Sequence, residues 1–357
     1  MTTQTDQSQV KAGQIILSID AMGGDQGPAA VVAGCDDAAR QAPGISFILH
    51  GPSAVLTPLV AKRKALAGRC VVRDAVDVVT MDDKPSQVVR NSTGTSMWSA
   101  IEAVREGEAA AAVSCGNTGA LMALSMIRLR RLPGVKRPAI AVLYPSANPQ
   151  GFNVLLDVGA DVRADADDLL RFALMGMSYA RNGLGLPRPR VGLLNVGTEE
   201  HKGRTELKEA FDLIRDQSDS AGFEFAGFVE GGDISGDICD VIVTDGFTGN
   251  VAIKTGEGTA SLVGIRLREA FKFSPLSRLA SLLAYTSLRR LRKKIDPRRV
   301  NGGVFLGLNG TVVKSHGSAD STGVSAAIRL AARLAEIQFT DKLAARVAAL
   351  PMEEPSS

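Results

Sequence analysis

The residues best suited to chemistry lie in short polar turns that follow apolar runs. The first turn begins at Asp20, after the run Ile15–Ile19, and continues through Gly23 and Gly24 to Pro28. The run is typical of a strand buried on both faces, and proline suits the first position of a helix. Backbone N–H groups in such a strand-to-helix turn can hold an anion. The spacing is not the G-x-G-x-x-G of dinucleotide-binding proteins, so the turn alone gives only weak support for a phosphate site.

The same order of apolar run, polar turn and helical pattern occurs at least six times along the 357 residues. The five later turns are Ser114–Gly119, Asp157–Asp161, Asn195–Gly203, Thr244–Asn250 and Lys314–Ser318. Alternating strands and helices predict right-handed crossovers and a three-layer α/β/α, Rossmann-like fold with a mostly parallel sheet. Ligands in such sheets bind outside the carboxyl ends of the strands, so we expect all six turns to converge on one cleft. That convergence favours an enzyme.

A chain of 357 residues can form one large α/β domain or two smaller ones. We predict a single α/β/α domain over residues 14–350, between tails 1–13 and 351–357 that we expect to be disordered. The chain is 45% hydrophobic, with 37 glycines and only 4% aromatic residues, which is typical of a core built from small and aliphatic side chains. Its first twelve residues are polar and lack the apolar stretch of a signal peptide. The longest uncharged run, Ala109–Ile127, has Gly, Asn and Thr at its centre. It therefore predicts a strand, a turn and a helix rather than a membrane span.

The cysteines and the net charge narrow the function classes further. The four cysteines are scattered and show no C-x-x-C spacing, which is typical of reduced thiols in a cytoplasmic protein. A net charge of +3 is too small to indicate a nucleic-acid partner.

Residues 262–300 break the alternation and predict a helical arm. The stretch 271–299 combines leucines with at least eight cations, which include Arg278, Arg289, Arg290, Arg292, Lys293, Lys294, Arg298 and Arg299. We expect a basic amphipathic hairpin with its hinge near Ser274–Pro275. Such a segment suits an anionic membrane surface, and packing against a second subunit explains it as well.

Several turns also carry longer motifs. Ile19–Pro28 reads I-D-A-M-G-G-D-Q-G-P, and Ser114–Met122 reads S-C-G-N-T-G-A-L-M. Further motifs follow at Arg137–Ala141, Leu155–Ala160, Val191–Gly197, Glu199–Gly203, Asp245–Val251 and Ser315–Ser318. This ordered set, over roughly residues 15–330, resembles the PlsX family, the acyl-[acyl-carrier-protein]:phosphate acyltransferases of bacterial phospholipid synthesis. Two positions depart from the family pattern, because Asp161 stands where we expect asparagine and Cys115 where we expect alanine. A carboxylate at position 161 would weaken phosphate affinity if it lined the site.

The resemblance implies transfer of a long-chain acyl group from acyl-[acyl carrier protein] to inorganic phosphate, giving an acyl-phosphate for phosphatidic acid synthesis. Phosphate is itself a nucleophilic oxyanion near neutral pH, because its second pKa lies near ~6. The protein therefore has to bind, partly desolvate and aim phosphate and to stabilise the tetrahedral oxyanion, without a covalent acyl-enzyme. The sequence has no G-x-S-x-G nucleophile elbow. Cys115 is not favoured as a nucleophile, since the family has alanine there.

No metal, nucleotide or other cofactor is expected. The three histidines, His50, His201 and His316, lie far apart and form no metal-binding motif with the cysteines.

Three residues are the candidates for catalysis: Lys202, His316 and Asn250. Lys202, next to Gly203 in its turn, is the first choice for the stabilising cation, and a solvated loop lysine is the alternative. His316 could donate to phosphate or protonate the leaving sulfur, or it could be a structural histidine bonded to a neighbouring turn. Asn250 is either a donor in the cleft or, with Asp245, a turn former.

The contacts to phosphate and substrate are expected from the glycine-rich turns and their polar neighbours. The set is Asp20, Gly23, Gly24, Ser114, Asn117, Thr118, Asp245, Gly317 and Ser318. Asn117 and Thr118 stand where a helix begins, so helix capping explains them as well as substrate contact does.

The expected partners follow from the family reaction and from charge. They are acyl carrier protein, inorganic phosphate, a second copy of the chain in a homodimer, a peripheral membrane surface contacted through 271–299 and, by function, a glycerol-3-phosphate acyltransferase. A basic group flanks the turn at Pro133–Gly134 and could steer an acidic carrier protein. A solvated helix end or a dimer contact explains this group as well. Its members are Arg128, Arg130, Arg131, Lys136 and Arg137.

Three other functions stay open on the sequence. A phosphate acetyltransferase-like enzyme would turn over short-chain acyl-CoA without a carrier protein. A dinucleotide-dependent dehydrogenase is disfavoured by the missing G-x-G-x-x-G. A non-enzymatic scaffold on the membrane surface would bind liposomes and be insensitive to changes at Lys202 or Asn117.

Overall fold

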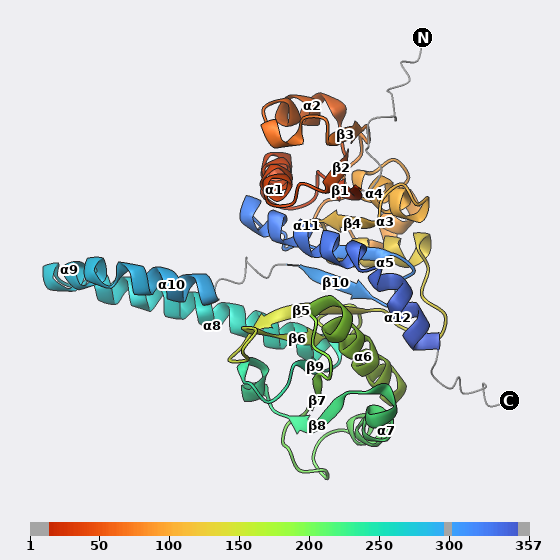
Figure 1. Ribbon diagram of the computed structural model, residues 1–357, viewed down its shortest axis with the longest axis vertical. Helices are drawn as coiled ribbons and strands as arrows, with labels where there is room; N and C mark the ends of the chain where they lie inside the picture. Colours follow the sequence, from red (N-terminus) through yellow and green to blue (C-terminus); the bar gives the residue numbers. More distant parts are fainter. Residues whose placement is uncertain (1–13, 296–301, 349–357) are drawn as a thin grey trace. The chain divides into compact units, whose positions relative to one another are not determined.

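A computed structural model describes residues 14–295 and 302–348 of the chain (Figure 1). These residues form two compact units. The first unit comprises 14–142, 178–187 and 302–348, and the second comprises 143–177 and 188–295. Each unit is described by itself below, and the single domain predicted over 14–350 stays a prediction. The predicted tails 1–13 and 351–357 lie outside the described residues.

The sheet of the first unit is parallel over five neighbouring strands. Its order is β3-β2-β1-β4-β11-β10-β5, in which β10 runs antiparallel to both β11 and β5. The strands are β1 (Ile15–Asp20), β2 (Ile45–His50), β3 (Cys70–Arg73), β4 (Ala111–Ser114), β5 (Ala139–Pro145), β10 (Gly303–Leu306) and β11 (Thr311–Lys314). β2, β4, β10 and β11 are buried along their whole length, as the apolar runs predict for strands covered on both faces.

Helices cover this sheet. They are α1 (Gly27–Gln41), α2 (Ser53–Ala61), α3 (Pro85–Asn91), α4 (Ser96–Arg105), α5 (Thr118–Arg128), α11 (Ser321–Glu336) and α12 (Phe339–Ala348), with short turns η2 (Lys64–Leu66) and η3 (Tyr179–Gly183). Among them, α1, α5 and α11 begin close to where the polar turns predict a helix. α1 and α11 pack side by side (Figure 1). They approach closely at Gly34, where an added Cβ would lie 2.5 Å from the Cβ of Val324.

The sheet of the second unit is parallel throughout, in the order β6-β9-β7-β8. Its strands are β6 (Phe152–Leu156), β7 (Arg190–Leu194), β8 (Glu224–Val229) and β9 (Val241–Val243). The helices that follow them are α6 (Ala166–Ser178), α7 (Thr205–Ala221), the short turn η4 (Gly231–Ser235) and α8 (Gly246–Lys272). The mostly parallel α/β architecture predicted from the alternation is therefore confirmed, with the antiparallel β10 as its exception.

The predicted arm is a helical hairpin. α8 extends to Lys272, and α9 (Pro275–Leu283) packs against it before α10 (Tyr285–Ile295) follows (Figure 1). The chain reverses at Ser274–Pro275, as predicted, because Ser274 caps α9 by accepting from the Ser277 N–H at 3.0 Å and proline fits its first turn. The side chains from 291 onward in the arm lie outside the described residues, which removes Arg292, Lys293, Lys294, Arg298 and Arg299 from the structural account. Among the described helices, none combines the length and the apolar character needed to cross a bilayer.

Candidate functional site

Three strand ends in the first unit bring polar side chains into register. Asp20 at the end of β1 pairs with Ser114 at the end of β4, and Ser114 pairs with Lys314 at the end of β11. All three side chains are buried. Parallel neighbours with aligned ends place their following turns at one edge of the sheet, which is where α/β proteins bind ligands.

Asp20 is the hub of this edge. Its carboxylate accepts from Ser114 Oγ at 2.6 Å and from Ser96 Oγ at 2.7 Å, so it ties β1 to β4 and to α4. Burial raises the pKa of the Asp20 carboxyl above its usual value, although these hydrogen bonds act to lower it. With both oxygens engaged by its neighbours, Asp20 shapes the turns rather than presenting itself to an anion.

The glycines of the first turn let two backbones meet above the strand ends. A Cβ on Gly23 would lie 2.6 Å from the Gly116 N atom, and one on Gly24 would lie 2.8 Å from the Cβ of Cys115. Gly24 also has a φ of +95°, a conformation that favours glycine. The Asp25 N–H donates to the Gly317 carbonyl at 2.8 Å, which joins this turn to the one after β11. The turns at 20–25, 115–119 and 315–318 therefore meet within the first unit.

Asn117 serves as a helix cap and as a clamp. Its Oδ1 accepts from the Ala120 N–H at 3.0 Å and so caps α5, while its Nδ2 donates to the carbonyls of Met81 and Asp83, both at 2.9 Å. The segment that carries Met81 is thus held over the turns, and the Met81 Cε would lie 3.1 Å from a Cβ on Gly317. The sequence gives no sign of this segment, because residues 80–84 carry no glycine-rich motif. Thr118 is the half-buried first residue of α5.

Lys314 is the residue that sequence reasoning missed. Its buried ammonium group donates to the Cys115 carbonyl at 3.2 Å and to the Ser315 carbonyl, so it places a positive charge between two of the three turns. The signal was available, because Lys314 directly precedes the Ser315–Ser318 motif at the end of an apolar strand. A lysine beside a polar turn is expected to be solvated, whereas Lys314 is buried in the structure.

His316 lies exposed beside Ser318, whose Oγ is 2.8 Å from its Nδ1 atom. The Ala319 N–H donates to the His316 carbonyl, and the Ser318 N–H donates to the ring at 3.3 Å. The ring is thus held through Nδ1 by Ser318 of its own turn, whereas the structural alternative predicts a bond to a neighbouring turn, and the side chain is exposed to solvent.

Cys115 is buried, and burial raises the pKa of its thiol despite a hydrogen bond from Ser315 and the charge of Lys314. A thiol with a raised pKa is a poor nucleophile. This supports the expectation that Cys115 does not form an acyl-enzyme.

In the second unit, the turn after β6 closes on the start of α8. The Asp157 carboxylate accepts from the N–H groups of Gly159, Ala160 and Asp161 at 3.0–3.2 Å. A Cβ on Gly249 would overlap the Asp157 carbonyl oxygen, so the backbone of α8 lies directly against this turn. The Asp161 carboxylate accepts from the Val162 N–H at 2.7 Å within its own turn.

Asp245 caps α8 and holds Arg204. Its Oδ1 accepts from the Thr248 N–H at 2.8 Å, and its Oδ2 accepts from Thr248 Oγ1 and from the Arg204 guanidinium. Burial by itself would raise the pKa of the Asp245 carboxyl, but the Thr248 and Arg204 hydrogen bonds hold it below its usual value. Asp245 is therefore an anion in the folded protein, and its described partners are Thr248 and Arg204.

Asn250, one turn along α8, is exposed and donates to the Val158 carbonyl at 3.3 Å. Its amide also lies against Gly159, where an added Cβ would be 3.0 Å from Nδ2. The Asn250 amide, predicted as a donor, therefore lies at the protein surface near the carboxyl ends of β6 and β9.

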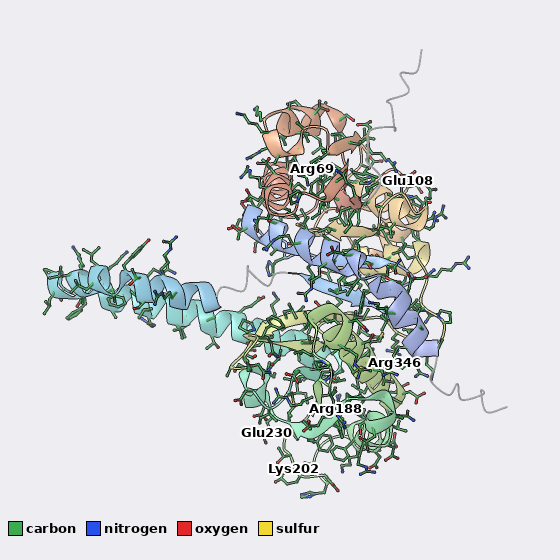
Figure 2. All side chains as sticks on the ribbon, in the orientation of Figure 1. Arg69, Glu108, Arg188, Lys202, Glu230 and Arg346 are labelled. Carbon is green, nitrogen blue, oxygen red and sulfur yellow. The ribbon has the colours of Figure 1, made fainter. Side chains whose placement is uncertain are left out.

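Lys202 lies on the open loop that follows β7 (Figure 2). Its ammonium group pairs with Glu199 Oε1 at 2.7 Å, and both side chains are nearly half exposed. Asn195 holds the loop, because its Nδ2 donates to the carbonyls of Gly197 and Lys202 at 3.1 and 3.2 Å. Lys202 and Asn195 belong to one polar turn of the sequence, which gave no indication of the ion pair with Glu199.

The structure thus gathers the sequence-predicted residues into two groups. The first unit holds Asp20, Gly23, Gly24, Ser114, Asn117, Thr118, His316, Gly317 and Ser318, and the second unit holds Lys202, Asp245 and Asn250. Within each unit the turns follow the carboxyl ends of neighbouring parallel strands. The convergence of all six turns on one cleft stays a prediction.

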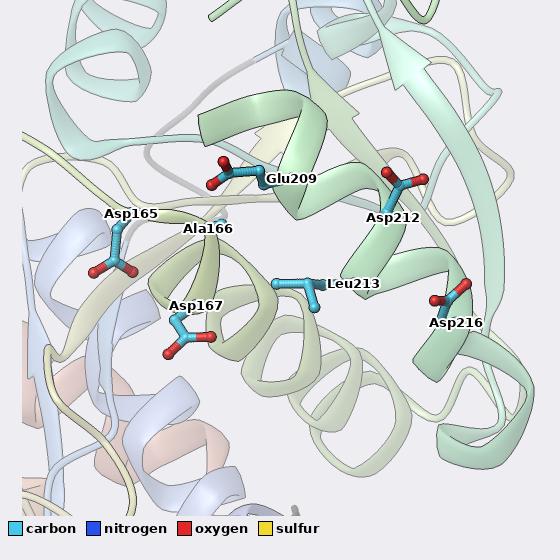
Figure 3. Close-up of a pocket in the computed structure, with 7 residues that line it drawn as sticks. All are labelled: Asp165, Ala166, Asp167, Glu209, Asp212, Leu213 and Asp216. Carbon is cyan, nitrogen blue, oxygen red and sulfur yellow. The ribbon is translucent and has the colours of Figure 1, made fainter. Parts of the chain in front are cut away.

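One cavity in the second unit does not suit the binding of phosphate or of an acidic carrier protein. It has a volume of about 510 Å³ and lies between the start of α6 and one face of α7 (Figure 3). Its lining is acidic, with Asp165, Asp167, Glu209, Asp212 and Asp216. Five carboxylates repel phosphate and an acidic carrier protein alike. Among the described residues, no group of three or more His, Cys, Asp or Glu side chains has the arrangement of a metal site.

The basic group of the first unit is partly engaged within the protein. Arg128 makes two hydrogen bonds of 2.7 Å to Glu102, and its guanidinium lies 4.3 Å from the centre of the Trp98 ring. Its charge is therefore neutralised locally. Arg130, Arg131, Lys136 and Arg137 are exposed, although the Arg131 guanidinium also donates to the Lys136 carbonyl.

Comparison with known proteins places this geometry in a family. A family model described as "Fatty acid synthesis protein" matches residues 15–342. The chain is 81% identical over 354 residues to a phosphate acyltransferase of Roseobacter denitrificans, covering 99% of each chain. It is 72% identical over 348 residues to a phosphate acyltransferase of Ruegeria pomeroyi, covering 98% of this chain and 94% of that one.

Solved structures share the fold at low sequence identity. A phosphotransacetylase from Streptococcus pyogenes superposes with a TM-score of 0.59 at 14% identity, over 92% of this chain and 96% of that chain. EutD phosphotransacetylase from Staphylococcus aureus gives a TM-score of 0.57 at 14% identity, over 94% and 96%. Likeness at this identity shows the α/β fold alone. By the family match and the identity to its relatives, the chain belongs to the fatty acid synthesis protein family, the PlsX phosphate acyltransferases that its motifs resemble.

Proposed function

We propose that this enzyme transfers a long-chain acyl group from acyl-[acyl carrier protein] to inorganic phosphate, giving the acyl-phosphate used in phosphatidic acid synthesis. A phosphate oxygen attacks the thioester carbon, the carbon–sulfur bond breaks, and the phosphate proton passes to the departing sulfur. The products are an acyl-phosphate and the free thiol of the carrier.

The observation that carries direct attack by phosphate is the state of the nucleophile candidates in the first unit. Cys115 is buried with a raised pKa, and the Ser114 hydroxyl donates to Asp20 while accepting from the Gly116 N–H at 3.0 Å. Neither is poised to accept an acyl group. Phosphate needs no such activation, since it is a dianion in part at neutral pH.

The turns around these residues offer the electrostatics that an oxyanion needs. The start of α5 follows directly after Gly116 and Asn117, and helix N-termini favour anions. Lys314 adds a buried positive charge beside the same turn. We assign the phosphate to this edge, with Gly23, Gly24, Thr118, Gly317 and Ser318 around it, and we keep Lys202, Asn250 and His316 as the candidates for catalysis.

The test is phosphate-dependent loss of palmitoyl-[acyl carrier protein], with acyl-phosphate detected by mass spectrometry. Lys202→Ala should lower kcat by about a hundredfold, the usual effect of removing one group that stabilises an oxyanion. Lys254→Ala is the matched control. Lys254 is also an exposed lysine that pairs with a glutamate three positions away in the sequence, Glu257, at 2.8 Å. It should retain wild-type rates.

Wild-type rates in Lys202→Ala would be compatible with the proposed reaction but would show that another residue supplies the stabilising cation. His316→Gln would then be the next variant to measure. No phosphate-dependent turnover by the folded wild-type protein would contradict the proposal. Turnover of acetyl-CoA with no use of the carrier-bound donor would favour the phosphate acetyltransferase-like alternative.

The partners follow from the same proposal. The carrier protein is acidic, and the exposed members of the basic group, Arg130, Arg131, Lys136 and Arg137, give a surface of opposite charge. The acyl-phosphate product carries a lipid tail, and the helical hairpin exposes large apolar side chains with arginines among them. We therefore propose peripheral contact with an anionic membrane through the hairpin, a homodimer, and delivery of the product to a glycerol-3-phosphate acyltransferase.

A further inference from the structure

A second cavity in the second unit lies at the carboxyl ends of β7 and β9. Its volume of about 360 Å³ is in the range of small-molecule sites. The walls come from the loop after β7, the start of α7, η4 and the first two turns of α8. Three apolar side chains are buried in it, and Val196 and Val251 stand exposed at its mouth. The buried three are Leu194, Leu207 and Ile234.

The charged and polar side chains of these walls are engaged within the protein. The Arg204 guanidinium donates to Asp245 Oδ2, so the two opposite charges of the lining neutralise each other. Thr248 Oγ1 donates to the same carboxylate oxygen at 3.0 Å. Asn195 Oδ1 lies beneath the backbone of Gly203 and is not presented to the cavity. A guest therefore meets a mainly apolar surface, on which polar groups would lose their hydration without gaining hydrogen bonds.

The mouth of the cavity adjoins two of the candidates for catalysis. A Cβ on Gly197 would lie 2.5 Å from Lys202 Cδ and 3.0 Å from its Nζ, so the Lys202 side chain lies against the neighbour of Val196. Asn250 directly precedes Val251, the exposed lining residue of α8. Exposed apolar side chains at the mouth of a cavity are typical of a ligand groove. A chain that enters here would leave its polar end beside Lys202 and Asn250.

We infer that this cavity binds the hydrocarbon chain of the acyl donor, and that Ala252 and Ile234 limit the chain length it accepts, an inference that rests on the proposed function. The chain is the part of the donor that carries no polar groups, as the lining requires. Each methylene group that moves from water into an apolar site strengthens binding about fourfold. The acidic cavity between α6 and α7 is unsuited to a chain, because its five carboxylates stay hydrated.

Ala252 and Ile234 are the positions at which chain length can be changed. Thr248, Val251 and Ala252 stand at i, i+3 and i+4 on α8, so they share the face that lines the cavity. Ala252 is the smallest apolar side chain of this lining, and a larger residue there fills the cavity. Ile234 comes from η4, a different wall, and its truncation to alanine enlarges the cavity. The two changes therefore act in opposite directions.

The kinetic test measures kcat/KM for acyl-[acyl carrier protein] donors from hexanoyl to stearoyl. Ala252→Phe displaces about three or four methylene groups, so it should lower the ratio of palmitoyl to hexanoyl turnover about a hundredfold. Ile234→Ala should shift the preference toward longer chains. Ala260→Phe adds the same ring to an exposed position of α8 that does not line the cavity, and it should keep the wild-type profile. KM for phosphate should be unchanged in all three variants.

A binding measurement separates this inference from the proposed function. The fluorescent fatty acid cis-parinarate is titrated into the wild-type protein, Ala252→Phe and Ala260→Phe, without carrier protein, and is then displaced with palmitate. Saturable binding that is lost in Ala252→Phe and kept in Ala260→Phe supports the site even if the enzyme shows no turnover. The control also accounts for fatty acid held by the exposed apolar side chains of the hairpin, which both variants retain.

Three results would overturn the inference. One is an Ala252→Phe protein that binds cis-parinarate as the wild type does. Another is an Ala252→Phe protein whose turnover falls equally for every chain length, because the cavity would then hold a part common to all donors. If Ala252→Phe does not fold, the Ile234→Ala profile decides, and an unchanged chain-length preference in that variant contradicts the assignment.

Discussion

Single residues in this protein are defined by what surrounds them more than by their type. Lys202 and Lys314 are both lysines next to strand-end turns, yet one is an exposed ion-pair partner and the other a buried donor to two carbonyls. Asn117 and Asn250 differ in the same way, since the first is consumed by a helix cap and a clamp while the second is exposed. The sequence motif identifies the residue type, but the surrounding structure determines whether the side chain is buried and which groups it contacts.

His50 illustrates this at a position with no catalytic role. It is fully buried between Ser18 Oγ and Ser99 Oγ, at 2.8 and 2.7 Å from its two ring nitrogens. Burial, with the charge of Arg73, lowers the pKa of His50 to about 3. The unfolded chain binds this proton near pH ~6.5. The folded state therefore holds fewer protons below that pH, and its stability falls as the pH drops from 6.5 toward 3, by about 2 kcal/mol at pH 5.

The measurement is the urea midpoint at pH 7 and pH 5 for the wild type and for His50→Gln, which keeps a polar side chain without the titration. The wild type should lose about 2 kcal/mol more than the variant between the two pH values. The difference between the two proteins cancels the groups they share. An equal loss in both would contradict the assignment of this pH dependence to His50.

At the scale of elements, the chain could be divided into strands and helices from its sequence because each polar turn marks a boundary. The run at 15–19 predicted β1, and the turn that ends at Pro28 predicted the start of α1, each to within a residue. The hinge at Ser274–Pro275 was equally legible, since serine caps and proline starts a helix. What the sequence could not supply is the lateral order of the strands. Only that order makes Asp20, Ser114 and Lys314 neighbours across nearly 300 residues, and it is the reason that Lys314 was missed.

The close approach of α8 to β6 gives a prediction about an element. Gly249→Ala would place a Cβ on the Asp157 carbonyl oxygen, where the backbone of α8 meets the backbone of the turn after β6. We expect a loss of roughly 1–3 kcal/mol in the free energy of unfolding, as for other overpacked sites. Gly258→Ala on the same helix has open space around its Cβ and should gain about 0.5–1 kcal/mol from helix propensity.

Urea denaturation of both variants checks the pair. The opposite signs are the informative part, because helix propensity alone predicts that both alanines stabilise. A stable Gly249→Ala protein would show that α8 can move away from the turn, and the geometry proposed for Asn250 would then have to be revised.

At the scale of the whole molecule, the hairpin is the feature that a self-contained enzyme does not need. Phe273 is 89% exposed, Leu283 is 80% exposed, and Leu276 and Leu282 are similarly open. Arg278, Arg289 and Arg290 lie in the same segment, within the described residues. Exposed apolar side chains beside cations are typical of an interfacial helix, and the product that we propose, a lipid-tailed phosphate, would benefit from release at a membrane.

The double variant Leu282→Gln with Leu283→Gln tests this use of the hairpin. Burying one leucine side chain is worth roughly 1.5–3 kcal/mol, so removing two should weaken binding to anionic vesicles by at least tenfold in a flotation assay. Vesicle binding by the wild type should also fall as salt rises, because the arginine contribution is screened within a Debye length of about 10 Å. Val162→Gln with Ile238→Gln removes exposed apolar side chains from the same unit outside the hairpin and should bind as the wild type does. If the hairpin variant binds vesicles normally but sediments as a smaller species than the wild type, the leucines belong to an interface between two copies of the chain. The proposed acyl-phosphate product would then have to reach the membrane by another surface.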